Sequence, residues 1–151
     1  AARMAQRGVS VADIKARVEE LRPRLHLLFV VDTLEYLARG GRIGKAQSVV
    51  GSVLNVKPLI TLKDGEFIPA GRVRTYAKAT ERLFEFVRDG QSKEFAFVVH
   101  NTTPDAARQM AERFSTFIDK KNIMVARLSP VLGVHAGPGT LFTGYLEGKT
   151  K

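Results

Sequence analysis

Two short glycine-containing segments hold the side chains of this sequence that are best suited to binding an anion. Arg42 follows two glycines in ARGGRIGKA (38–46), and His135 lies between glycines in GVHAGPG (133–139). Glycine has no side chain, so the backbone can come close to a bound group, and successive amides in such a loop can form an anion-binding nest. The same segments also suit simple corners between helices, so residue types and spacing alone leave both interpretations open.

The first segment looks like a phosphate-binding loop but lacks its essential residues. A P-loop follows G-x-x-x-x-G-K-[ST], in which backbone amides wrap the phosphates and the hydroxyl ligates magnesium. Here the residue five before Gly44 is Arg39, and Ala46 stands where the hydroxyl is required. Residues 33–39 also indicate a short helix rather than the strand that precedes a P-loop. The sequence therefore argues against a nucleotide site.

Other catalytic and metal-binding patterns are missing from the sequence. It contains no cysteine and three histidines, and no two histidines have the spacing of a metal site. No Ser–His–Asp or Cys–His set can be argued. His26 and His100 lie within or at the end of apolar runs, where a structural role is expected. We therefore expect no catalytic residues, no metal and no cofactor.

The positive charge is concentrated around the first glycine segment. The 151 residues carry a net charge of +9. Residues 39–78 contain eight Lys and Arg against Asp64 and Glu66 alone, so this segment contributes +6 of the total. A focused positive field favours an anionic ligand or partner, although basic residues scattered over a solvated face would give the same composition.

The composition is that of an ordinary globular domain without a membrane segment. The apolar run at 27–31 is far too short to span a bilayer, and no signal-peptide pattern is present. The absence of cysteine fits a reducing compartment. We expect a cytoplasmic protein.

Amphipathic helices alternate with apolar strands along the chain. The clearest hairpin is at 57–75, because Asp64-Gly65 joins two apolar-rich runs and suits a tight primed turn. Helices are expected at 10–23, 33–39, 45–55, 75–87 and 103–118, strands at 25–31, 94–100 and 123–128, and a glycine-rich loop at 129–140. The pattern predicts an α/β domain with two layers, in which helices cover a mixed sheet.

The first nine residues indicate that the sequence is part of a longer protein. AARMAQRG begins in a helical pattern without an initiating methionine or a cap, and Gly8 ends that pattern as a C-cap would. We interpret residues 1–9 as the remnant of a connecting helix and residues 10–151 as one domain.

Two long motifs resemble the DegV family of bacterial proteins. The first is TLEYLARGGRIGKAQSVVGSVLNVKPLITLKDGEFIPAGRVRTYAKA (33–79), and the second is SPVLGVHAGPGTLFTGY (129–145). The resemblance implies the C-terminal domain of a two-domain protein whose N-terminal domain is missing here. Members of the family bind a long-chain fatty acid in the cleft between the domains, and in some bacteria present it to an ATP-dependent fatty acid kinase, which makes an acyl phosphate.

The resemblance also implies roles for individual residues. His135 matches the histidine that contacts the fatty-acid carboxylate, and Arg42 matches an arginine of the same head-group network. The supporting loops would contain Gly40, Gly41, Gly137 and Gly139. The acyl tail would be lined by apolar residues near Arg42, for which ordinary core packing is the favoured alternative: Ile43, Val49, Val50, Val53 and Leu54. Arg72 and Arg74 would form a surface for an anionic substrate or the kinase partner.

Two other interpretations remain open at this point. The basic segment could belong to a nucleic-acid-binding module, although only Phe67 and Tyr76 offer aromatic rings for base stacking near it. The isolated domain could also bind nothing and act as a folding unit. Loss of a second domain would expose an apolar interface, so self-association is also expected to be feasible.

Overall fold

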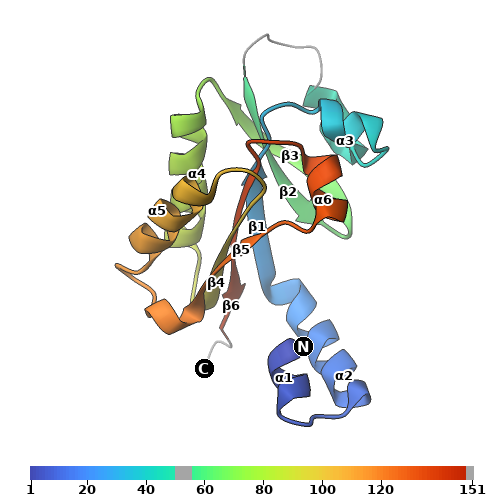
Figure 1. Cartoon of the computed structure of the whole chain (residues 1–151), viewed down its shortest axis with the longest axis vertical. Coiled ribbons are helices and arrows are strands. Elements are labelled where there is room, and N and C mark those ends of the chain that lie inside the picture. Colours follow the sequence, from blue (N-terminus) through green and yellow to red (C-terminus); the bar gives the residue numbers. More distant parts are fainter. Residues whose placement is uncertain (50–55, 149–151) are drawn as a thin grey trace.

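Six strands form one mixed sheet in the part of the chain that the computed structural model describes, residues 1–49 and 56–148 (Figure 1). The strands are β1 (Leu25–Val30), β2 (Lys57–Lys63), β3 (Glu66–Val73), β4 (Lys93–His100), β5 (Ile123–Arg127) and β6 (Leu141–Glu147). Their order across the sheet is β3-β2-β1-β6-β4-β5, and β4–β5 is the parallel pair among antiparallel neighbours. The predicted α/β class with a mixed sheet is confirmed.

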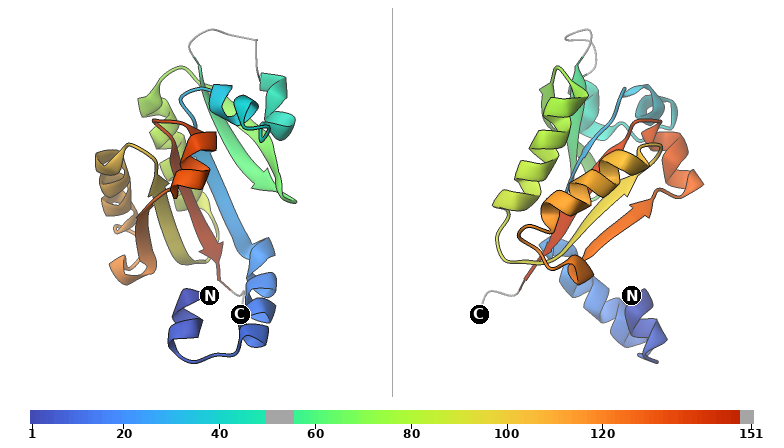
Figure 2. Two further views of the ribbon diagram at one scale, coloured as in Figure 1. Left: turned by 45° about the vertical axis from the view of Figure 1, so that its right-hand side comes forward. Right: turned by 60° about the vertical axis from the view of Figure 1, so that its left-hand side comes forward.

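One face of the sheet is covered by α4 (Tyr76–Asp89) and α5 (Pro104–Phe114), as Figure 2 shows. The Thr75 hydroxyl accepts a hydrogen bond from Lys78 N at 3.2 Å, which caps α4, and Pro104 begins α5. Between these helices and the sheet lies the main core, which includes Leu28, Val30, Leu83, Val87, Val98, Met110, Phe114 and Leu141. The helices predicted at 75–87 and 103–118 therefore each bury an apolar face in the core, although α5 ends at Phe114 and Phe117 is 37% exposed.

The opposite face carries shorter elements. These are α3 (Glu35–Arg39), the 3₁₀ helix η2 (Gly44–Val49) and α6 (Pro130–Ala136). They cover a smaller buried cluster around Phe29, whose ring stacks on Phe142 with 4.3 Å between centroids and meets Phe67 edge-on at 5.3 Å. This face therefore has a core of its own beneath three short helices.

The N-terminal helices α1 (Ala2–Gln6) and α2 (Val11–Leu21) extend away from the sheet (Figures 1 and 2). Ser10 caps α2, since its hydroxyl accepts from Asp13 N at 3.1 Å. No residue of α2 is buried, and Val11 is 83% exposed. The apolar positions of α2 therefore do not contribute to the core. Two further 3₁₀ helices are η1 (Arg22–Arg24) and η3 (Lys120–Asn122).

The hairpin of β2 and β3 has the predicted turn. Asp64 and Gly65 both have positive φ, 53° and 81°, which is the backbone of a primed two-residue turn. The helix predicted at 45–55 is a 3₁₀ helix over Gly44–Val49 where it is described, and residues 50–55 lie outside the described residues.

The prediction of a glycine-rich loop over 129–140 is wrong for α6, and β6 was not predicted. β6 lies in the middle of the sheet, between β1 and β4. Gly144 interrupts its apolar pattern, and glycine normally weakens a strand. A Cβ at Gly144 would lie 2.3 Å from His26 O and 2.3 Å from Phe97 Cζ. Close packing across the sheet therefore requires glycine at position 144. The same glycine makes β6 difficult to predict from the sequence.

Candidate functional site

The end of α3 packs against the last turn of α6 through two contacts between a ring and a glycine. A Cβ at Gly40 would lie 2.0 Å from His135 Nδ1, and one at Gly137 would lie 2.4 Å from Tyr36 Cδ2. The His135 ring of α6 thus contacts Gly40 at the end of α3, and the Tyr36 ring of α3 contacts Gly137 at the end of α6. This corner brings the two segments containing Arg42 and His135 together, although they are far apart in the sequence.

His135 lies in the last turn of α6, and not in a loop as predicted. Ser129 caps the helix, with its hydroxyl 3.5 Å from Leu132 N, and Pro130 occupies the first turn. A serine cap followed by proline is a helix-start signal that the sequence does contain. The ring is half-buried, and its Nδ1 atom is buried without a hydrogen-bond partner.

Arg42 follows α3 and folds back on it. Its backbone N–H donates to Leu37 O at 2.9 Å, and its Nη1 donates to Gly40 O at 3.2 Å. Gly41 has a left-handed φ of 65°, which allows the chain to turn at this point. Gly40 therefore contacts the His135 ring and also accepts from the Arg42 guanidinium.

Arg42 differs from the two cations beside it. Arg39 pairs with Glu35 at 2.6 Å, and Lys45 pairs with Glu66 at 2.7 Å. The exposed guanidinium of Arg42 has no carboxylate within ion-pair distance among the residues in 1–49 and 56–148. It is the cation of this loop that is available to an external anion.

The Gly137–Gly139 turn uses its amides internally. Gly137 N donates to Gly133 O at 2.9 Å, and Gly139 N donates to Thr102 Oγ1 at 2.9 Å. The Asn101 side chain donates to Gly137 O at 2.7 Å and to Gly133 O at 3.3 Å. These two amides are therefore not available as the predicted anion nest, and the glycines serve to hold α6 in place.

A polar group beneath the corner was not predicted from the sequence. Asp32, two residues after β1, pairs with Lys57 at the start of β2, and a Cβ at Gly139 would lie 3.2 Å from Asp32 Cβ. Burial raises the pKa of the nearby Tyr76 hydroxyl, and the negative charge of Asp32 adds to this. Before α3, the Thr33 hydroxyl accepts from Glu35 N at 3.2 Å, and no side chain caps the helix at its N-cap Leu34.

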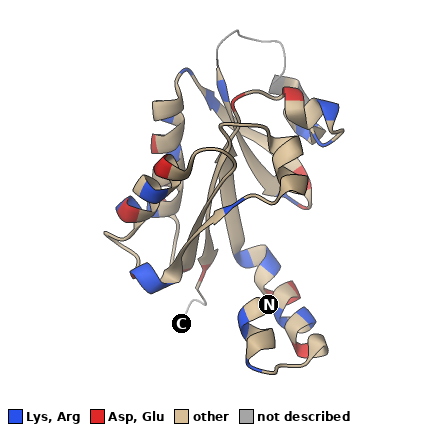
Figure 3. Ribbon diagram, in the orientation of Figure 1, with Lys and Arg blue, Asp and Glu red and all other residues tan. Residues whose placement is uncertain are grey.

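The remaining predicted residues lie around the corner or outside the described residues. Ile43 packs against the cluster around Phe29, which supports its interpretation as core. Val50, Val53 and Leu54 lie outside the described residues, and so does the side chain of Val49. Arg72 and Arg74 are exposed at the end of β3 that leads into α4. Figure 3 shows the distribution of these and the other charged residues over the ribbon.

Next to His135, α6 exposes an apolar surface. Val131, Leu132 and Val134 are 71%, 56% and 66% exposed, and positions 131 and 132 precede His135 by one helical turn. The corner thus combines hydrogen-bond donors with exposed apolar side chains. This arrangement suits a ligand with an anionic head and an apolar remainder.

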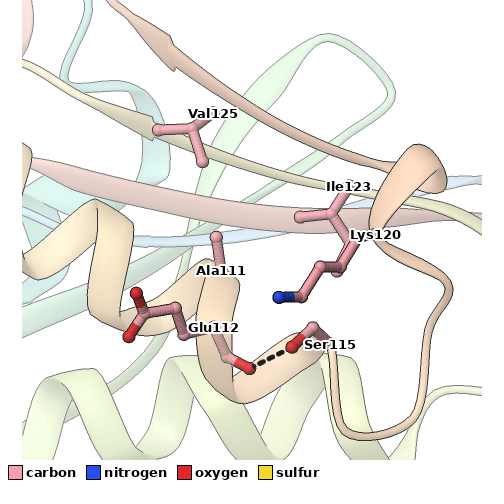
Figure 4. Close-up of a pocket in the computed structure, with 6 residues that line it drawn as sticks. All are labelled: Ala111, Glu112, Ser115, Lys120, Ile123 and Val125. Atoms are coloured by element: carbon pink, nitrogen blue, oxygen red, sulfur yellow. Dashed lines mark hydrogen bonds between the residues drawn. The ribbon is translucent and has the colours of Figure 1, made fainter.

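Two grooves of the described part of the chain lie away from this corner. Figure 4 shows one between α5 and β5, lined by Ala111, Glu112, Ser115, Lys120, Ile123 and Val125. A second groove lies beside α4 and includes Phe86 and Tyr145. Neither includes Arg42 or His135. Among the described residues, no three acidic, histidine or cysteine side chains are grouped as metal ligands, and no helix is long and apolar enough to cross a membrane.

Comparison with known proteins identifies the family. The family model "Uncharacterised protein, DegV family" matches residues 1–147. A DegV domain-containing protein of Streptomyces coelicolor is 39% identical over 144 residues, which cover 93% of this chain and 51% of that protein.

Two solved structures share the fold. A DegV family protein of Thermus thermophilus, described as fatty acid binding, has a TM-score of 0.81 at 34% identity, over 95% of this chain and 53% of that one. The Streptococcus pneumoniae fatty acid kinase (Fak) B3 protein, loaded with linoleic acid, has a TM-score of 0.79 at 20% identity, over 96% of this chain and 52% of that one. This chain thus spans about half the length of these proteins. The match over residues 1–147 confirms the resemblance of the two motifs, and the chain belongs to the DegV family.

Proposed function

We propose that this chain forms the head-group part of a long-chain fatty-acid site. His135 and Arg42 hold the carboxylate, and the acyl tail continues into a cleft shared with a second domain of the parent protein. The observation that carries this proposal is the convergence of His135 and Arg42 on Gly40, next to the exposed apolar surface of α6. The fatty-acid binding described for the Thermus thermophilus protein supports the ligand class.

The chemistry of the corner matches such a ligand. A carboxylate that leaves water must be paired or hydrogen-bonded, and a guanidinium is a strong partner because its hydrogen bonds are charge-assisted. The tail supplies most of the affinity, since about 0.8 kcal/mol per buried methylene gives roughly 8 kcal/mol for ten methylenes before ordering costs. The head-group site then needs only to orient the ligand and to contribute a modest part of its binding affinity.

Native mass spectrometry of the two-domain parent protein, purified without added lipid, tests this proposal. We expect a bound long-chain fatty acid in the wild type and its loss in His135→Ala and Arg42→Ala. Arg39→Ala is the matched control, because Arg39 ends α3 three residues before Arg42 but is paired with Glu35. A parent protein that stays empty when offered fatty acids would overturn the proposal.

We further propose that the parent protein presents the carboxylate to a fatty acid kinase and is not itself an enzyme. The family resemblance and the name of the Streptococcus pneumoniae protein support this role. Arg72 and Arg74, exposed at the end of β3, are the proposed contact surface. Arg74→Ala should lower acyl-phosphate production by kinase and parent protein together, whereas Lys63→Ala, at the other end of the hairpin, should not. Unchanged production with Arg74→Ala would argue against this surface.

The ion pairs of the basic segment weaken the alternative of nucleic-acid binding. Of its eight cations, Arg39, Lys45 and Lys57 are paired with carboxylates of the same chain. Such pairs leave fewer cations to neutralise phosphates, and phosphate neutralisation supplies most non-specific affinity for nucleic acid. Retention of the parent protein on DNA at physiological salt would support nucleic-acid binding instead.

A further inference from the structure

We propose that Gly40 is a positioning residue that fixes the tautomer of His135. It holds the neutral imidazole with its proton on Nε2, so that Nε2–H is the group that donates to a carboxylate. This inference rests on the proposed head-group function. It specifies which atom of His135 binds the carboxylate and which residue determines that atom.

The first argument is steric. Gly40 has φ −79° and ψ −2°, a helical conformation that any residue adopts. Its lack of a side chain therefore has no conformational explanation. A Cβ at this position would lie 2.0 Å from His135 Nδ1, 2.8 Å from Cε1 and 3.1 Å from Cγ. The Nδ1 edge of the ring thus occupies the space that a side chain at position 40 would fill.

The second argument comes from hydrogen bonding. His135 Nδ1 is buried and has no hydrogen-bond partner. A proton on Nδ1 would be a buried donor without an acceptor, which is costly. An unprotonated Nδ1 is a buried acceptor beside Gly40, and a Cα–H group is a weak but tolerated partner for such an acceptor. In a neutral ring one nitrogen carries the proton and the other does not, so burial of Nδ1 against Gly40 selects the Nε2–H form.

The third argument is that Gly40 also orients Arg42. Its carbonyl accepts from Arg42 Nη1 at 3.2 Å, while its Cα faces the His135 ring. One residue therefore sets the direction of both donors. The positive charge at the site then comes from the guanidinium, and the histidine adds a directed hydrogen bond. An ionised carboxylate can accept from both groups at once.

Nitrogen NMR of the chain with 15N-labelled histidine tests the tautomer directly, at a pH at which the rings are neutral. We expect a protonated Nε2 and an unprotonated Nδ1 for His135. His135→Ala assigns the signals. A protonated Nδ1 in His135 would overturn the inference whether or not the protein binds fatty acid, so this result is independent of the proposed function.

Two glycine variants test the positioning role. Gly40→Ala should displace the ring, change the His135 nitrogen signals, and weaken fatty-acid binding by the parent protein about tenfold or more. Gly8→Ala is the matched control, because a Cβ there meets nothing within 4 Å and Gly8 lies outside the corner. It should strain the backbone at φ 74° but leave the His135 signals unchanged.

A double variant keeps the test valid if Gly40→Ala folds poorly. In Gly40→Ala/His135→Ala the ring that the new methyl group meets is gone, so the thermal midpoint should return toward that of His135→Ala alone. Gly40→Ala with wild-type His135 signals and wild-type fatty-acid affinity would overturn the inference. A parent protein that binds no fatty acid, combined with altered His135 signals in Gly40→Ala, would contradict the proposed function and leave the positioning role intact.

Discussion

The two faces of the sheet are built in different ways. The face under α4 and α5 is covered by long helices that carry fully buried apolar residues, such as Leu83 and Phe114. The face under α3 and α6 is covered by helices of five and seven residues that touch through glycines and rings. α6 leaves Leu132 and its apolar neighbours exposed. We infer that the first face mainly stabilises the domain. The second face buries less apolar surface and carries the proposed head-group site.

The largest expected effect compares the same substitution on the two faces. Leu83 is 0% exposed beneath α4, and Leu132 is 56% exposed on α6. Leu83→Ala should lower the free energy of unfolding by about 2–5 kcal/mol through the cavity it leaves, whereas Leu132→Ala should change it by less than about 0.5 kcal/mol. Urea unfolding of both variants measures this difference. Equal destabilisation would contradict the division between the faces.

A second pair of variants examines the contact between α3 and α6. Gly137 and Gly8 both have left-handed φ, 78° and 74°, but only Gly137 faces a ring, that of Tyr36. Gly8→Ala should cost about 1–2 kcal/mol of backbone strain, and Gly137→Ala should cost clearly more, because its ψ of 171° is a conformation that essentially only glycine adopts and because its methyl group meets Tyr36. Thermal unfolding measures both. Tyr36→Ala should recover part of the loss in Gly137→Ala, and no recovery would show that the ring is not the cause.

The helix caps give a smaller and more selective effect. Thr75 caps α4 and Ser129 caps α6. Thr75→Ala should lower stability by about 1 kcal/mol and leave fatty-acid affinity unchanged. Ser129→Ala should cost less stability, because its bond to Leu132 N is long at 3.5 Å, but should weaken binding by loosening the helix that carries His135. Calorimetry and ligand titration of the parent protein separate these outcomes, and the reverse assignment would contradict the account.

Local signals in the sequence predicted much of the stable face. Thr75, Thr103-Pro104 and the apolar spacing that follows each indicate α4 and α5, and Asp64-Gly65 indicates the hairpin turn. Gly144 and Gly133 made β6 and α6 difficult to predict, because a glycine indicates a loop when its contacts in the folded chain are not known. In both cases the glycine is needed by a distant residue: a Cβ at Gly144 would meet His26 O, and one at Gly133 would lie 3.1 Å from Asn101 Oδ1.

The site corner was predicted only in part, for the same reason. The sequence and the family resemblance indicated Arg42 and His135, but they did not show that Gly40 contacts both. The Gly40–His135 and Tyr36–Gly137 contacts join segments far apart in the chain, so no local pattern reports them. Contacts of this kind depend on the sheet order, which places the end of β1 beside the start of β6.

The most direct test of the central claim compares a long-chain fatty acid with its methyl ester in binding to the two-domain parent protein. The tail is the same in both ligands, but the ester has no negative charge for Arg42 to pair with. We predict that the wild type prefers the acid by about tenfold or more and that Arg42→Ala removes most of this preference, while Arg39→Ala keeps it. Equal binding of acid and ester by the wild type, or a preference that survives in Arg42→Ala, would contradict the claim that this corner holds a carboxylate.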